Sequence, residues 1–530
     1  MRLKPGLTLV LLLAACGGAQ GGGGKTILRV AYEREIDVLN PFTSQNLADI
    51  GYTMIEGLVT TDEHNRYIPV LAKTIPTREN GLVKTTAKGM VEITWPLQDS
   101  VRWHDGVPFT SKDVCFTWKF VTSPNSETYN REQYLNIKDC RTPDDHTVVF
   151  VWDGEYAYYD GLFEAILPEH VLGGLSTEAI VKYEPYNRGP KTIGTGPFKF
   201  AEWKSGEYIR LVRNDQYWRG RALPKIDEIV WAFIPDANTR LNALKSGQYH
   251  YGRIQPNQVK DVKDLAGYQT HLVSQNSVMH LDVSRRTPHG ALIFRDERVR
   301  RAIFQAIDRQ AIAGQLMEGT VQVANSPINP TSRFHKADLA VPAVDTAASK
   351  GLLDQAGWVP GADGVRHKGA DRLAFLISNR AGATDRIAVA QVIQAQLKAI
   401  GVEVTFETLE SAAWTNKWRS GQWEAVVSAW FLPADPSLTG LYACDGANNM
   451  AGFCDPDLDV LLKRSDRTLD DQARKRDLDL VQERLIATAR TLPLYYNVIP
   501  EVVSTRIGNY RASGTNFGSF WNVFDWTLAP

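Results

Sequence analysis

Residues 384–406 read TDRIAVAQVIQAQLKAIGVEVTF, and this stretch decides the class of fold. Apolar residues in its first part recur every three or four positions, which predicts a helix with one buried face: Ile387, Ala390, Ile393, Leu397 and Ile400. Gly401 follows, as glycine often does at the end of a helix. The next residues alternate between apolar and polar, as in a strand. A helix, a glycine and a strand in this order form half of a β-α-β crossover, so we predict an α/β fold.

The same two periodicities alternate along the rest of the chain. They predict a strand at 27–32, strands around Phe198 and Ile209, a helix that begins at Thr110, and a helix that ends at Gly247. A single long amphipathic helix is expected over 297–316, and a final one over 470–489. We see no internal repeat and no long low-complexity linker. Domains joined by short crossing strands are therefore expected.

The first residues are typical of an export signal. Arg2 and Lys4 precede an apolar run at 7–13, which is too short to span a bilayer. The sequence Leu-Ala-Ala-Cys that ends at Cys16 resembles the lipobox of bacterial lipoproteins, and this resemblance implies that Cys16 is acylated. An ordinary secretory signal with an incidental cysteine is the alternative. The glycine-rich residues after Cys16 are expected to act as a flexible tether, so residues 1–24 lie outside the fold.

Composition limits the class of protein further. A chain of 530 residues is too long for one hydrophobic core, so two or three domains are expected. Its 59 Lys and Arg residues nearly balance 60 Asp and Glu residues, which gives no electrostatic reason to expect nucleic acid as a partner.

Cysteine usage agrees with export. Beyond Cys16 an even number of cysteines remains, which suggests two disulfides in an exported chain. Proximity in the sequence favours Cys115 with Cys140 and Cys444 with Cys454, whereas the two other pairings and buried free thiols stay open. No CxxC or Cys/His spacing indicates zinc, so we expect neither a metal nor a cofactor.

Motifs of known enzymes do not appear in a suitable context. Residues 19–26, AQGGGGKT, fit a relaxed phosphate-binding loop, but no strand precedes them and a strand rather than a helix is expected to follow. The chain contains neither HExxH nor GxSxG. No catalytic residue is therefore assigned. A secreted hydrolase built from scattered carboxylates is the enzymatic alternative.

Several segments in order resemble the peptide- and nickel-binding substrate-binding proteins of ABC transporters. They are WHDGVPFT (103–110), GTGPF (194–198), RNDQYW (213–218), RLNALKSG (240–247), RVRRAI (298–303) and QLKAIGV (396–402). The resemblance implies two lobes that enclose a ligand by hinge closure. It places the first lobe at 25–45, 190–270 and 497–530, an extra subdomain of that lobe at 46–189, and the second lobe at 271–496.

This resemblance implies a receptor rather than an enzyme. The protein would capture a peptide or peptide-like solute and deliver it to an ABC permease in the inner membrane. It would be a monomer, exported to the periplasm or cell surface and held at the membrane by its lipid anchor. A binding protein that serves a sensor, or that chaperones exported peptides without import, is the alternative.

The family also suggests where the ligand binds. In its peptide binders, a tryptophan followed three residues later by an aspartate anchors the free amine of the peptide. The matching stretch here begins at Trp430, but the third residue after it is Pro433, and alignment on the later Asp-Pro puts Leu432 there instead. Neither residue carries a negative charge, so a blocked or cyclic peptide, a peptide antibiotic or an unrelated small solute is as open as a free-amine peptide. Asp435 is a candidate substitute.

Position in the family pattern adds further candidates. Gln45, Asn379 and Arg380 are expected near the cleft, beside Trp430. Cys444 and Cys454 would close a structural loop next to it. Other tryptophans of this region are predicted to serve in packing: Trp414, Trp418 and Trp423.

Overall fold

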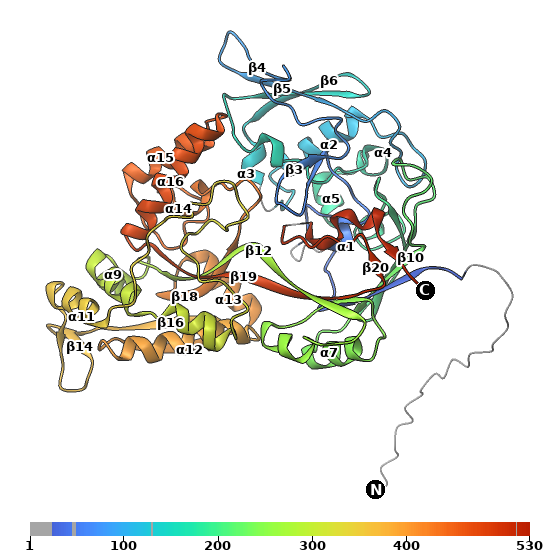
Figure 1. The fold of residues 1–530 in the computed structure, drawn as a ribbon. Helices are drawn as coiled ribbons and strands as arrows, with labels where there is room; N and C mark the ends of the chain where they lie inside the picture. The colour runs from blue at the N-terminus through green and yellow to red at the C-terminus, as the bar shows by residue number, and fades with distance from the viewer. Residues whose placement is uncertain (1–23, 45–48, 129–130, 516) are drawn as a thin grey trace, which may run out of the picture.

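The computed structural model describes residues 24–44, 49–128, 131–515 and 517–530. Its largest sheet has ten strands and runs through the lower part of the molecule (Figure 1). In spatial order the strands are β17 (Glu403–Leu409), β16 (Ala374–Arg380), β18 (Ala425–Phe431), β12 (Tyr268–Val283), β19 (Thr491–Ser504), β11 (Tyr251–Arg253), β1 (Ile27–Tyr32), β10 (Glu228–Phe233), β9 (Tyr208–Arg213) and β8 (Phe198–Lys204).

Two long strands, β12 and β19, join the two ends of this sheet. They pair antiparallel from Tyr268 opposite Ser504 to Asp282 opposite Thr491. One end of the pair extends the strands β11, β1, β10, β9 and β8, which we call the first half-sheet. The other end extends β18, β16 and β17, the second half-sheet. The register shifts between Ser274 and Val278, close to the middle of the pair.

The first half-sheet has its own apolar core. Trp231 of β10 packs there against Phe520 and Trp526, which belong to the last segment of the chain. That segment includes the 3₁₀ helix η4 (Gly518–Asp525). Helix α7 (Ala237–Lys245) connects β10 to β11.

The second half-sheet is accompanied by helices and contains β16 and β17 as a parallel pair. The helices are α9 (Glu297–Ala306), α11 (Thr346–Gln355), α12 (Thr384–Lys398), α13 (Ser411–Ser420), α14 (Thr439–Tyr442), α15 (Pro456–Asp466) and α16 (Asp471–Ala487). Residues of α9 and α12 form one core with the sheet, whereas α14, α15 and α16 contribute to another.

A separate unit is inserted between β1 and β8. It runs from β2 (Val59–Thr61) to α6 (Glu184–Asn187), and we call it the inserted unit. Its antiparallel sheet contains β4 (Val83–Thr85), β5 (Val91–Pro96), β7 (Thr147–Trp152) and β6 (Ile137–Asp144), and helix α2 (Ser111–Thr122) shares its core. The lobe and subdomain boundaries given above stay a prediction.

Most local predictions are confirmed. Thr110 caps α2 with a capping box to Asp113, and β16, α12 and β17 form the expected crossover, with Gly401 at a φ of +80°. Both predicted disulfides are present, Cys115–Cys140 and Cys444–Cys454. Cys16 lies outside the described residues. No helix in the described part of the chain is long and apolar enough to cross a bilayer.

The single helix expected over 297–316 is wrong. Helix α9 ends at Ala306, because Ile307 is extended, with φ −94° and ψ 113°. Asp308 then caps a second turn by accepting a hydrogen bond from the N–H of Ala311. The apolar periodicity continues through this break, since Ile307 and Ile312 are both buried in the core, which is why the sequence pattern did not reveal it.

Candidate ligand site

The end of β18 brings Trp430 to the border between the second half-sheet and the inserted unit. The next residue but one, Leu432, donates its N–H to the carbonyl of Asn276 on β12. The side chain of Asn276 in turn donates to Asn65 Oδ1 of the inserted unit, at 2.7 Å. Trp430 is half-buried and Phe431 is 38% exposed. Partly exposed aromatic side chains therefore lie where β18, β12 and the inserted unit meet.

Two further tryptophans extend this aromatic surface. Trp414 and Trp418 lie one helical turn apart on α13 and stack with their ring centres 5.8 Å apart and an angle of 11° between the planes. Trp418 also contacts Trp430, at 5.1 Å. Both residues of α13 are only half-buried, so the prediction that they serve in packing describes them incompletely, whereas Trp423 is 2% exposed as expected.

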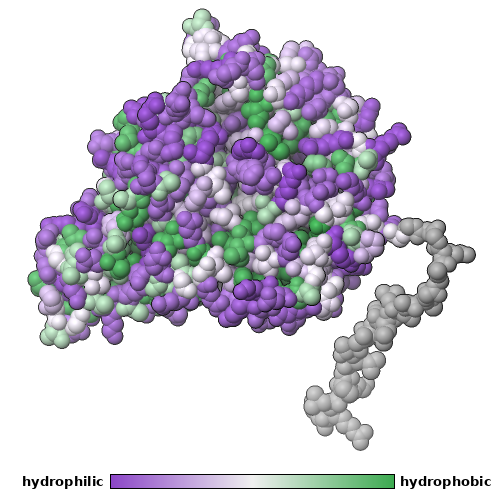
Figure 2. All heavy atoms as spheres, viewed as in Figure 1, coloured by the Kyte–Doolittle hydropathy of each residue, from purple (hydrophilic) through white to green (hydrophobic). Residues whose placement is uncertain are grey.

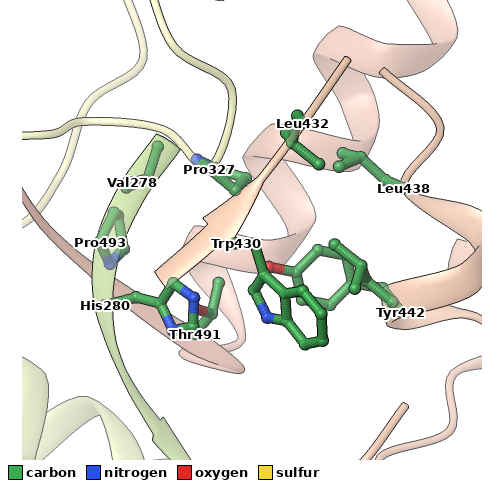
Figure 3. Close-up of a pocket in the computed structure, with 10 residues that line it drawn as sticks. Val278, His280, Pro327, Trp430, Leu432, Leu438, Tyr442, Thr491 and Pro493 are labelled. Carbon is green, nitrogen blue, oxygen red and sulfur yellow. The ribbon is translucent and has the colours of Figure 1, made fainter. Parts of the chain in front are cut away.

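A small pocket lies behind Trp430, between the sheet and α14 (Figure 3). Its walls are mainly apolar: Val278, Pro327, Trp430, Leu432, Leu438, Leu441, Tyr442 and Pro493, with His280 and Thr491 as polar members. A second small pocket shares Trp430, Leu441 and Tyr442 with the first.

His280 is the unexpected residue of this pocket. It is 3% exposed, and its ring lies nearly parallel to Trp430, with centres 6.5 Å apart. Its Nδ1 lies 3.0 Å from Asp282 Oδ2, and Thr491 donates to the other oxygen of Asp282. Among the described residues, neither ring nitrogen of His280 forms a hydrogen bond. The sequence offered one signal. Val278, His280 and Asp282 lie two residues apart and so share one face of β12, and two of them are polar although a buried strand is usually apolar.

Asp435 faces arginines rather than this pocket. Its exposed fraction is 1%, Arg474 Nη1 lies 2.6 Å from its Oδ2, and Arg333 Nη2 lies 3.2 Å from the same oxygen. Arg474 is itself buried and lies over the rings of Tyr158 and Phe334. These contacts give the carboxylate a structural partner, and its role as a direct solute contact stays a prediction.

The remaining predicted contacts are placed as follows. Asn379 and Arg380 are the last residues of β16, where Asn379 is buried and Arg380 is exposed. Neither lines the two pockets around Trp430. Gln45 lies outside the described residues.

The inserted unit also contacts the second half-sheet beyond β18. Tyr158 donates its hydroxyl to the carbonyl of Pro436 and to Asp466, both at 2.8 Å. The N–H of Ala157 donates to the backbone carbonyl of Asp466. These bonds hold the inserted unit against the loop that follows β18 and against the last residue of α15. Figure 2 shows that polar side chains cover most of this face of the molecule, with smaller apolar patches between them.

Two half-sheets linked by a pair of long strands, with aromatic side chains at their junction, define a two-lobed solute-binding protein. The chain belongs to the bacterial extracellular solute-binding proteins, family 5, whose model for the middle region matches residues 66–452. This is a family of binding proteins. The resemblance inferred from the sequence is thereby confirmed.

Known relatives extend the match over the whole chain. The oligopeptide-binding protein AppA of Bacillus subtilis is 26% identical over 557 aligned residues, which cover 100% of this chain and 98% of that protein. The structure of AppA in complex with a nonapeptide matches with a TM-score of 0.81 and 25% identity, covering 96% of this chain and 100% of that one.

A third comparison shows the same fold with a different ligand. NikZ from Campylobacter jejuni, solved in complex with Ni(L-His), matches with a TM-score of 0.81 at 22% identity, and the match covers 95% of this chain and 100% of NikZ. The predicted α/β, two-lobed fold is confirmed by these structures.

Proposed function

We propose that this protein captures a peptide or peptide-like solute between its lobes and delivers it to an ABC importer. The observation that carries the proposal is an open backbone edge beside Trp430. Strand β18 pairs with β12 from Val283 opposite Ala425 to Ser277 opposite Phe431. On its other side, the described residues of β16 pair with it at one position, Ile377 opposite Ala425.

The pleat determines which backbone groups face this open edge. The carbonyl of Glu424 accepts a hydrogen bond from the N–H of Ser284, and the N–H of Leu432 donates to the carbonyl of Asn276. Both bonds lie on the side of β18 that faces β12. Because bonded residues alternate along an antiparallel strand, Ala429 and Phe431 turn their N–H and C=O groups the other way. An extended peptide can add to such an edge by main-chain hydrogen bonds, which recognise a peptide whatever its sequence.

The aromatic surface supports the same proposal. A strand added beside β18 would place alternate side chains on the face that carries Trp430, next to Trp418. Rigid aromatic rings bury a large area at a low cost in conformational entropy. Relatives with a peptide ligand, such as AppA in its nonapeptide complex, agree with this assignment.

A separate point concerns the amino end of the solute. Position 433 is a proline and position 432 a leucine, so neither offers a counter-charge to a free amine. The carboxylate of Asp435 is already paired with Arg474. We therefore propose a solute whose amine is blocked, cyclised or left outside the cleft.

Native mass spectrometry of the untagged protein, purified gently from its host, tests the proposal directly. A mass excess over the denatured protein identifies the solute, and fragmentation shows whether it is a peptide and whether its amine is free. Recovery of a solute without peptide bonds would contradict the proposed class. A free-amine peptide would contradict the proposal about its end.

Replacing Trp430 by alanine tests the site. We expect a loss in affinity of about 2 kcal/mol or more for the recovered peptide, or roughly thirtyfold, because a central aromatic anchor is removed. Trp430→Phe keeps part of the ring surface and should lose less. Titration calorimetry measures both, with Trp203→Phe in the first half-sheet as a control. An unchanged affinity in Trp430→Ala would remove Trp430 from the site.

We also propose that the protein is exported, anchored through Cys16 and monomeric. The support is the family, described as extracellular, together with the signal-like first residues. Metabolic labelling with palmitate should mark the protein, and Cys16→Ser should release it from membranes. Labelled protein in the Cys16→Ser variant would contradict the anchor. Light scattering measures its oligomeric state.

A further inference from the structure

Another cavity lies away from Trp430 and its two pockets, where the first half-sheet meets the inserted unit. Its walls come from the segment after β1, from β2 and β3 (Tyr67–Pro69), and from the last segment of the chain around η4. Most of the lining is apolar or aromatic: Tyr52, Ile55, Val59, Ile68, Val70, Phe517, Phe520 and Val523. None of these residues lines the pockets beside Trp430.

One cation, the half-buried Arg219, borders this apolar space. The guanidinium of Arg219 lies between two aromatic rings, 4.8 Å from the centre of Trp218 and 4.5 Å from that of Phe524. Burial raises the pKa of the Tyr217 hydroxyl, and Arg219 nearby opposes this shift. Among the described residues Arg219 forms no ion pair within 4.0 Å, and its Nε is buried without an acceptor. A buried charged donor with no acceptor is costly and is normally satisfied by a partner.

A second unsatisfied donor lines the same cavity. The indole N–H of Trp521 is buried and has no hydrogen-bond partner among the described residues. An indole N–H can only donate, and so can a guanidinium. Both groups can therefore donate to an acceptor, and the surrounding walls favour an apolar body attached to it.

The acidic residues of the cavity do not supply that acceptor. Glu56 accepts hydrogen bonds from Tyr217, Trp218 and Thr195, at 2.7 to 2.9 Å. Burial raises the pKa of Glu56, although Arg219 nearby opposes this shift. Its carboxylate is thus turned to three donors of its own. Glu164 lies on the wall and also has interactions of its own.

From these contacts we propose that the cavity is a second ligand site, which binds a small carboxylic acid with an apolar or aromatic body. The carboxylate would accept from Arg219 Nε and from the indole of Trp521, while the body of the ligand packs against the aliphatic and aromatic walls. The site is separate from the peptide edge at β18, so it does not depend on the function proposed above.

Phenylacetate is a suitable probe, with phenylacetamide as its uncharged counterpart. We expect saturable binding of phenylacetate to the full-length protein by calorimetry and saturation-transfer NMR. Phenylacetamide should bind at least about tenfold more weakly, because a hydrogen bond to a charged group is worth roughly 1.5 to 3 kcal/mol. Equal binding of both probes, or no binding of phenylacetate at millimolar concentration, would overturn the proposal.

Variants locate the binding to this cavity. Arg219→Met removes the charge but keeps the length of the side chain, and Trp521→Phe removes only the N–H donor and part of the ring. Each should weaken phenylacetate binding, with the greater loss in Arg219→Met. Arg219→Lys keeps the charge and should retain part of the affinity.

The chain offers a matched control. Arg188 also lies over a tryptophan, 4.7 Å from the ring centre of Trp203, but it does not line the cavity. Arg188→Met should bind phenylacetate as the wild type does, and so should Trp430→Ala. Wild-type affinity in a folded Arg219→Met, checked by its melting temperature, would refute the site. A loss in Arg188→Met equal to that in Arg219→Met would refute it as well.

Discussion

Replacing Asp435 by asparagine should destabilise the protein by about 3 to 5 kcal/mol, because it leaves a buried guanidinium without its counter-charge. Only 1% of Asp435 and 2% of Arg474 are exposed. The guanidinium also lies 4.4 and 4.5 Å from the ring centres of Tyr158 and Phe334, so it cannot turn to water without losing this packing. Arg333 is about half exposed and can follow the solvent.

Differential scanning calorimetry at pH 7 measures the loss. For a folding unit of 150 to 250 residues, 1 kcal/mol corresponds to about 2 to 4 °C, so the variant should melt roughly 6 to 20 °C lower. Asp445→Asn is the matched control. Its ion pair with Lys463 is exposed, with side-chain fractions of 71% and 50%, and such pairs contribute about 1 kcal/mol or less.

A double variant separates the pair from its individual members. Asp435→Leu with Arg474→Met removes both charges, and replacing a buried pair by apolar residues is often neutral. The double variant should therefore be more stable than Asp435→Asn. If Asp435→Asn melts like the wild type but binds solute more weakly, the reasoning fails, and the carboxylate serves the ligand as the sequence had suggested.

Two further outcomes follow from the structure. Burial and the neighbouring Asp435 raise the pKa of Asp160 to about 7, against Arg333 and Arg474, which lower it. The folded protein then holds a proton that the unfolded chain loses near pH 4, so the melting temperature should fall as pH rises from about 4 to 7. Asp160→Asn should flatten this part of the profile, and an unchanged slope would contradict the assignment. In Gly194→Ala the new Cβ would lie 1.9 Å from the carbonyl oxygen of Met54. Soluble yield should drop sharply, whereas Gly174→Ala, with nothing within 4 Å, should fold normally.

Local elements and the family were accessible from the sequence, because each depends on residues close together in the chain. The capping box at Thr110 and the crossover around Gly401 are examples. The break at Ile307 was not accessible, since a buried extended residue keeps the apolar period intact. The side chain of Asp308 caps the turn that follows this break.

The site was only partly accessible for a related reason. Trp430 was expected at the cleft from its family position, and its role as a ligand contact stays a prediction. His280 lies about 150 residues earlier and comes into contact only through the pairing of β12 with β18. Arg219 directly follows the recognised segment 213–218, but its missing acceptor is a property of the folded surroundings.

The register shift in the pair β12–β19 has a mechanical consequence. The pairing is interrupted between Ser274 and Val278 on one strand, and only Asn497 lies between the corresponding residues Val498 and Tyr496 on the other. An interval without strand-to-strand hydrogen bonds bends more easily than the paired segments on either side, since bending there stretches no such bond. We expect the two lobes to rotate about this interval while each half-sheet keeps its shape. Separation of the lobes would also have to break or rearrange hydrogen bonds that cross from the inserted unit, among them those of Asn65 with Asn276 and of Tyr158 with Pro436 and Asp466.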